Sequence, residues 1–125
     1  MSIDINSPES RKALAKMVTK LFSLWGLEPV DQLALLGLDP ADEDLLDCLR
    51  SGEAELPETG ETMERVSWLL TVHKALRIAY PYNRDLVYRW VTAKNLRYDG
   101  RTPLEIMRQE GLAGIKRIAV YLESI

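Results

Sequence analysis

The segment from about Glu61 to Tyr80 constrains the fold more than any other part of the chain. Its polar residues recur at helical spacing and form one narrow stripe, made of Glu64, Ser67, Thr71 and Lys74. Apolar residues cover nearly all of the remaining helix surface, namely Val66, Trp68, Leu69, Leu70, Val72, Ala75, Leu76 and Ala79. A helix this apolar must lie in the centre of a core or be covered by a second subunit. The pattern predicts a helical core, and its second alternative predicts at least a homodimer.

Helix start and stop signals divide the rest of the chain into short helices. Capping residues or prolines mark the expected starts, which are Ser7-Pro8, Pro29, Asp39-Pro40, Asn83 and Thr102-Pro103. Glycine or proline marks the expected ends, at Gly26, Gly37, Gly52, Pro81 and Gly111. Thr102 and Glu105 have the spacing of a capping box, and Asp99-Gly100 is typical of a turn. Because no run alternates at period two, we predict an all-α fold of about seven helices.

Charge divides unevenly between two regions separated by the expected loop Ala54–Gly60. Residues 1–57 carry 5 Lys/Arg and 11 Asp/Glu, a net charge of −6. Residues 58–125 carry 11 Lys/Arg and 8 Asp/Glu, a net charge of +3. The asymmetry indicates either two differently solvated faces or two halves with different partners. A third interpretation makes the two halves partners of each other in a dimer.

Composition indicates one cytoplasmic domain. The 125 residues are 46% hydrophobic and 28% charged, which is ordinary for a globular protein. No apolar run approaches the roughly 18 residues of a membrane-spanning helix, and residues 1–8 lack the pattern of a secretory signal. The single cysteine, Cys48, cannot form an internal disulfide, which favours a reducing compartment. We therefore expect no association with a membrane.

No set of residues predicts an active site, a cofactor or a metal. His73 is the only histidine, and its place on an apolar helix is typical of a satisfied core or interface residue. Cys48 has no histidine or second cysteine near it in sequence, and the acidic residues at 42–47 lack a calcium-loop pattern. The sequence therefore predicts a binding protein and not an enzyme.

Residues 32–52 have the outline of a helix-turn-helix. The small Ala34 would allow close helix contact, Gly37 would form the turn, and Asp39 would cap the recognition helix. Residues 39–50, however, carry five carboxylates against one cation, Arg50. Since DNA is a polyanion, we expect this region to bind DNA weakly when the protein is alone.

Aromatic residues are concentrated in the second half of the chain. We expect Trp25 and Trp68 to pack in the core, as aromatic residues at helical spacing usually do. Tyr80, Tyr82 and Tyr88 cluster in one short stretch. The core is the favoured interpretation for them, although tyrosine and tryptophan are also common interface anchors.

The motifs of residues 65–122 resemble those of the Xre/MbcA/ParS antitoxins, the partners of RES-domain toxins in bacterial type II toxin–antitoxin modules. The residues that carry the resemblance are Arg65–Leu70, His73–Leu76, Tyr88–Val91, Asn95, Asp99–Met107 and Val120–Leu122. The similarity extends over roughly residues 10–125. In two places the chain departs from many members: Lys94 stands where they have proline, and some continue beyond the position of Ile125.

The resemblance implies an antitoxin that covers the active site of a RES-domain toxin, which consumes NAD or transfers ADP-ribose. Residues 58–125 would bind the toxin, with the C-terminal end close to the toxin's cleft. Residues 1–57 would support dimerisation and, in some members, operator binding. The expected toxin-binding residues are Arg101, Thr102, Lys116, Arg117, Tyr121, Glu123 and Ile125. We expect the Arg101 side chain to be free for a partner. The alternative function is a helix-turn-helix transcriptional autorepressor.

Overall fold

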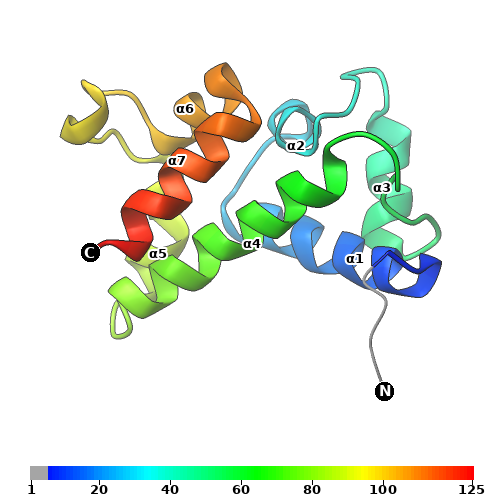
Figure 1. Cartoon of the computed structure of the whole chain (residues 1–125), viewed down its shortest axis with the longest axis horizontal. Coiled ribbons are helices and arrows are strands. Elements are labelled where there is room, and N and C mark those ends of the chain that lie inside the picture. Colours follow the sequence, from blue (N-terminus) through cyan, green and yellow to red (C-terminus); the bar gives the residue numbers. More distant parts are fainter. Residues whose placement is uncertain (1–5) are drawn as a thin grey trace. The chain divides into compact units, whose positions relative to one another are not determined.

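The structure is a computed structural model and describes residues 6–125. Within this range the chain forms seven α-helices and no strand, which confirms the predicted all-α fold (Figure 1). The elements are α1 (Pro8–Leu24), α2 (Pro29–Leu36), α3 (Glu43–Ser51), α4 (Thr62–Ala79), α5 (Arg84–Arg89), the 3-10 turns η1 (Trp90–Thr92) and η2 (Leu96–Tyr98), α6 (Pro103–Glu110) and α7 (Leu112–Glu123). Over the same residues, no helix has the length and apolar character needed to cross a membrane.

Local capping chemistry accounts for most helix starts. The Ser7 hydroxyl accepts a hydrogen bond from the Ser10 amide at 3.1 Å and caps α1. At the start of α6, the Glu105 amide donates to the Thr102 hydroxyl at 3.0 Å, and the Thr102 amide donates to the Glu105 carboxylate at 3.4 Å. This reciprocal pair is the predicted capping box.

The predicted start of the third helix is wrong. We expected Asp39 to cap it and Pro40 to open it, but α3 begins at Glu43. The Asp39 carboxylate instead accepts from the Ala41 amide, two residues along, at 2.8 Å. An aspartate that bonds its own backbone in this way forms a turn in place of a helix cap.

The chain divides into two compact units at Val66–Ser67, a boundary that lies inside α4, whereas we expected the division after residue 57. In unit 1 (residues 1–66), α3 packs against both α1 and α2. Two buried side chains hold the loops of this unit. Arg11 donates from Nη1 to the Leu56 carbonyl at 2.9 Å, and the Thr62 hydroxyl donates to the Leu36 carbonyl at 3.0 Å.

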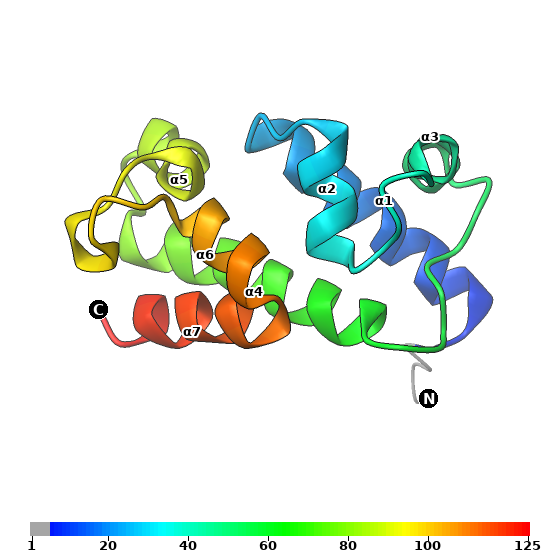
Figure 2. The same cartoon turned by 90° about the horizontal axis from the view of Figure 1, so that it is seen from above.

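In unit 2 (residues 67–125), α5 contacts α4 through the stacked rings of Tyr88 and His73, and α6 and α7 form a closely packed helical pair (Figure 2). The buried apolar residues of this pair are Ile106, Met107, Ile115, Ile118, Ala119 and Leu122. Gly114 allows the close packing, because a Cβ atom there would lie 2.6 Å from the Ile106 carbonyl oxygen. Any larger residue would force α7 away from α6.

Burial within one chain accounts for the apolar character of α4. Leu69, Val72 and Leu76 are fully buried, so the helix does not need a second subunit to cover them. Trp25 is in the core as predicted, but Trp68 is only half-buried. The largest exposed apolar side chain of α4 is Ile78, which is 69% exposed. A homodimer stays a prediction, and this helix no longer argues for it.

Candidate partner-binding site

A group of aromatic and cationic side chains surrounds Tyr121 near the end of α7. The Arg97 guanidinium carbon lies 3.9 Å from the centre of the Tyr121 ring, which is close enough for a strong cation–π contact. The Trp90 ring stacks with Tyr121 at 6.5 Å between centroids, and the Tyr98 ring meets it edge-on at 6.2 Å. With Arg117, these residues form what we call the Tyr121 cluster.

Arg117 is the second arginine that lies against a tyrosine ring of this cluster. Its guanidinium carbon lies 5.3 Å from the Tyr98 ring centre, while Nη1 pairs with the Glu110 carboxylate at 2.7 Å. Burial raises the pKa of the Tyr98 hydroxyl, and the positive charges of Arg97 and Arg117 act against that shift. Tyr98 is therefore uncharged at neutral pH, and the cluster holds two arginines, of which Arg117 is paired with Glu110.

A closed loop places Arg97 on Tyr121. The Asn95 side-chain oxygen accepts from the Arg97 amide at 3.0 Å, and the Gly100 amide donates to the Asn95 carbonyl at 3.1 Å. The Asn95 amide in turn donates to the Arg101 carbonyl at 3.1 Å. Asp99 adopts a left-handed conformation with φ of 57°, which lets the loop close. The loop explains why asparagine and Asp99-Gly100 occur at these positions.

The expectation that Arg101 is free is wrong. Its Nη1 donates to the Gln109 side-chain oxygen at 2.9 Å, and its Nε donates to the Tyr98 carbonyl at 3.3 Å. Thr102 is likewise engaged in the capping box of α6. Both residues therefore stabilise the loop that leads into α6, and their role in toxin binding stays a prediction.

The other predicted residues lie along α7 and at its end. Lys116 Nζ lies 6.0 Å from the ring centre of the half-buried Trp68, apart from the Tyr121 cluster. Glu123 is exposed, and Ile125 is 63% exposed. Val120, which precedes Tyr121, is 59% exposed although its side chain is apolar. The structure thus brings Arg117 and Tyr121 together and leaves Lys116, Glu123 and Ile125 outside the cluster.

Sequence reasoning missed Arg97, the cation closest to Tyr121. The two residues are far apart in sequence and come together only when the loop beginning at Asn95 closes. Asn95 belongs to the motifs that carry the resemblance, and its ability to cap η2 is the signal that could have identified Arg97, two residues further along. Leu96, next to Arg97, is almost fully exposed.

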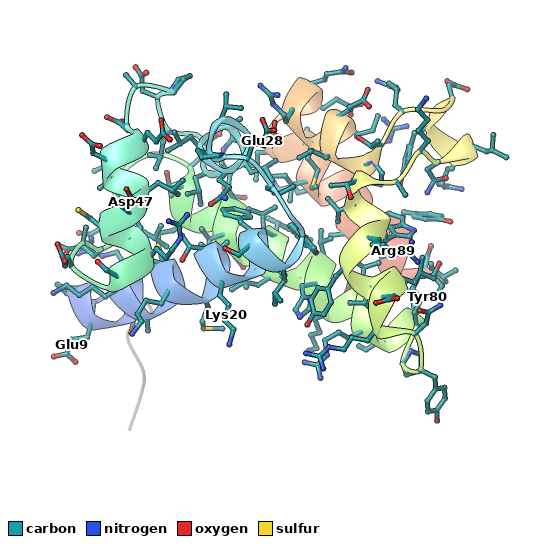
Figure 3. The ribbon with its side chains drawn as sticks, turned by 180° about the vertical axis from the view of Figure 1, so that it is seen from behind. Glu9, Lys20, Glu28, Asp47, Tyr80 and Arg89 are labelled. Atoms are coloured by element: carbon teal, nitrogen blue, oxygen red, sulfur yellow. The ribbon has the colours of Figure 1, made fainter. Side chains whose placement is uncertain are left out.

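In unit 1, α3 has the place that the recognition helix has in a helix-turn-helix, and its exposed side chains are mostly carboxylates. Glu43, Asp44 and Asp47 are exposed on α3, and Asp47 projects from this helix in Figure 3. Arg50 pairs with Asp47 at 2.9 Å, so this cation is engaged. Six residues separate α2 from α3, whereas a helix-turn-helix has a turn of about three or four. Both the charge and the length of the turn differ from those of a DNA-binding motif.

The fold and the Tyr121 cluster define a small all-helical protein in which the buried Trp90 and Tyr98 support the half-buried Tyr121 beneath the exposed Arg97. Among residues 6–125, no group of three or more His, Cys, Asp or Glu side chains could hold a metal. No family model and no solved structure matches the chain. Over 100 residues the chain is 32% identical to the "Uncharacterized protein y4oB" of Sinorhizobium fredii (strain NBRC 101917 / NGR234), covering 80% of this chain and 74% of that protein. The chain belongs to the same family as that protein.

Proposed function

We propose that this protein is an antitoxin that neutralises a RES-domain toxin by binding over its active site. The observation that supports the proposal is the convergence of separate motif residues at the Tyr121 cluster. Asn95 and Gly100 close the loop that carries Arg97, and Arg97 lies on Tyr121, which belongs to the last of the motifs. The same motifs carry the resemblance to the Xre/MbcA/ParS antitoxins.

The chemistry of this surface suits a protein partner. Tyrosine, tryptophan and arginine are the side chains that most often anchor protein interfaces. The exposed Val120 and Ile125 add apolar area close to Tyr121 in sequence. Unit 2 has 10 Lys/Arg and 5 Asp/Glu, a net charge of +5, which would speed its association with an acidic surface. In this proposal the antitoxin acts in the cytoplasm, as a homodimer within the complex with the toxin.

An exposed apolar residue next to the cluster offers a direct test. We expect Val120→Glu to abolish rescue of cells that express a cognate RES-domain toxin, because it places a charge in a buried interface. Met17→Glu is the matched control, since Met17 is 55% exposed and lies in unit 1. Rescue and co-purification with the toxin should be lost only for Val120→Glu.

The controls decide how the result is interpreted. Both variants should keep the circular dichroism spectrum and unfolding temperature of the wild type, because both positions are exposed. If Val120→Glu and Arg97→Gln are folded and still rescue the cells, the Tyr121 cluster does not bind the toxin. Deleting Tyr121–Ile125 is a poorer test, because it also removes Leu122 from the core.

A DNA-binding autorepressor is the second candidate. The packing of α2 on α3, with Gly37 in a left-handed conformation between them, favours it. The exposed carboxylates of α3 oppose it, since they repel phosphate. A salt-sensitive, submicromolar shift of the promoter upstream of this gene, by the protein without toxin, would establish this function.

A further inference from the structure

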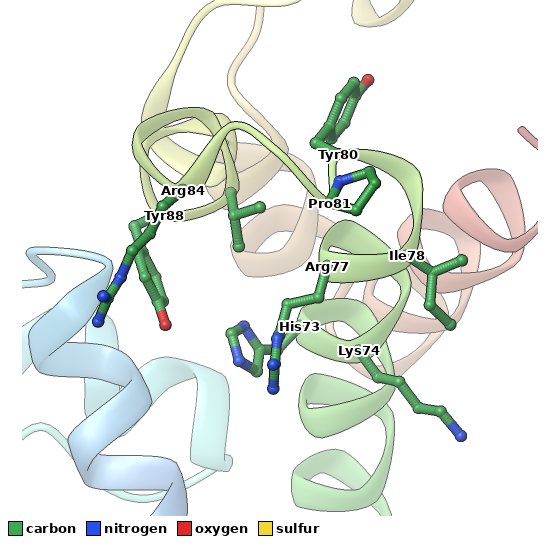
Figure 4. A pocket seen from close by; sticks show the side chains of 9 residues that line it. His73, Lys74, Arg77, Ile78, Tyr80, Pro81, Arg84 and Tyr88 are labelled. Carbon is green, nitrogen blue, oxygen red and sulfur yellow. The ribbon is translucent and has the colours of Figure 1, made fainter.

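Unit 2 also contains a hollow, and none of the residues that line it belongs to the Tyr121 cluster. It has a volume of about 760 Å³ and is formed by the C-terminal half of α4, the turn at 80–83 and α5 (Figure 4). Sites for small ligands typically measure about 300–1,000 Å³. We call it the His73 hollow, after the α4 residue that faces α5 within it.

One wall of the hollow is aromatic. The rings of His73 and Tyr88 stack with their centroids 5.6 Å apart and their planes 20° from parallel. The Arg84 guanidinium carbon lies 5.9 Å from the centre of the Tyr88 ring. In Figure 4 the His73 imidazole points from α4 toward Tyr88, while Lys74 and Ile78 lie on the other side of Arg77. A planar molecule could therefore extend this aromatic stack.

His73 is not the satisfied residue that its position predicted. Its Nδ1 atom is buried, and no side chain or backbone group of the described residues forms a hydrogen bond with it. Burial lowers the pKa of His73, and the positive charge of Arg77 lowers it further. The ring is therefore neutral at pH 7, and it contributes its aromatic face, not its buried nitrogen, to the hollow.

Three cations line the same hollow, and none of its lining residues is acidic. Lys74 and Arg77 extend from α4, and Arg84 extends from α5. Within residues 6–125, none of the three forms an ion pair with a carboxylate. Three uncompensated positive charges around one concave surface favour an anion.

We propose that the His73 hollow binds a small organic anion in which a planar ring is joined to a phosphate, as in a nucleoside monophosphate. The ring would stack against the His73–Tyr88 pair, since aromatic side chains and bases stack through their π-faces. The phosphate would accept hydrogen bonds from Arg77 and Arg84, whose planar guanidinium groups fit phosphate oxygens in pairs. A bare anion would leave the aromatic wall uncovered, and an uncharged ring would leave the cations unpaired.

The test is an NMR titration of the full chain with adenosine 5′-monophosphate, adenosine and inorganic phosphate. We expect the monophosphate to bind more tightly than either fragment and to shift the amide signals of Arg77, Arg84 and Tyr88. Arg84→Gln should weaken binding about tenfold, because it removes a charge-assisted contact. Arg89→Gln is the matched control on the same helix: Arg89 is exposed, does not line the hollow, and its replacement removes the same charge.

Each other outcome overturns the proposal. Absence of shifts with millimolar monophosphate means that the hollow is not such a site. Equal affinity for inorganic phosphate means that the ring contributes nothing and the surface is only an anion patch. Equal effects of Arg84→Gln and Arg89→Gln mean that net charge, and not this hollow, governs binding. Shifts of these signals by a DNA duplex but not by the monophosphate indicate a nucleic-acid surface. All of these readouts are made without a toxin, so they are independent of the proposed antitoxin role.

Discussion

Arginine serves different purposes in the two units. In unit 1, Arg11 is buried and donates to two backbone carbonyls, those of Asn6 at 2.9 Å and Leu56 at 2.9 Å. In unit 2, three arginines lie against tyrosine rings: Arg84 on Tyr88, Arg97 on Tyr121 and Arg117 on Tyr98. The first kind of contact ties backbone segments together, whereas the second holds exposed guanidinium groups against tyrosine rings.

Net charge follows the same division. Unit 1 has 6 Lys/Arg and 14 Asp/Glu, a net of −8, against +5 for unit 2. The difference in net charge between the two parts is therefore larger when the chain is divided at Val66–Ser67 than when it is divided after residue 57. The two proposals above lead us to expect that the recognition surfaces lie in unit 2. The three predictions below test that difference, in order of expected effect.

Replacing Trp90 would show whether the Tyr121 cluster is also part of the core of unit 2. Trp90 is buried and stacks on Tyr121, so Trp90→Ala leaves a large cavity next to that ring. We expect a loss of about 3–5 kcal/mol in the free energy of unfolding, measured by urea denaturation. A loss below about 1 kcal/mol, the usual size for a surface change, would mean that Trp90 serves binding alone.

Replacing Arg11 tests the structural role of arginine in unit 1. Arg11→Met removes both hydrogen bonds and leaves the Leu56 carbonyl without its buried donor. We expect the free energy of unfolding to fall by about 1–3 kcal/mol, while toxin rescue persists in cells that contain enough folded protein. Lys12→Met is the control, because Lys12 is exposed on the same helix. Equal stability of the two variants would contradict the proposed role of Arg11.

The smallest effect is a change in the pH dependence of stability through His73. Its pKa is lower in the folded chain than the value of about 6.5 in the unfolded chain. The unfolded state therefore binds more protons between these two values, and stability decreases as the pH falls from about 6.5 to the folded pKa. His73→Gln should flatten this part of the profile of urea midpoint against pH. Parallel profiles for the two proteins across that window would show that His73 does not titrate differently on folding.

Sequence reasoning identified the helices well because their ends depend on local chemistry. The bounds of α2 agree with the start predicted at Pro29 and the end predicted at Gly37, and the cap of α6 is formed by residues three positions apart. The start of α3 was missed because Asp39 can cap a helix or close a turn with equally short-range contacts. Trp68 was expected in the core but is only half-buried, since a periodic pattern does not show how wide the buried face is.

The candidate sites were predicted less completely because they depend on contacts between distant residues. The family resemblance led us to expect Tyr121 and Arg117 at the binding surface, and the structure places both in one cluster. Neither the contact of Arg97 with Tyr121 nor the engagement of Arg101 by Gln109 follows from spacing along the chain. The His73 hollow likewise depends on how α5 contacts α4, which no single helix pattern predicts.

The close packing at Gly114 has a consequence for the kinetics of folding. Only Gly111 lies between α6 and α7, so their contact closes a very short loop and costs little chain entropy. Contacts between near neighbours in sequence form early, and we expect this helical pair to nucleate unit 2 before the Asn95 loop reaches α7. Replacing Gly114 with a larger residue should then lower the folding rate. A substitution at a contact that forms later should mainly raise the unfolding rate. The one position without a side chain would thus set the pace at which the arginine–tyrosine surface is assembled.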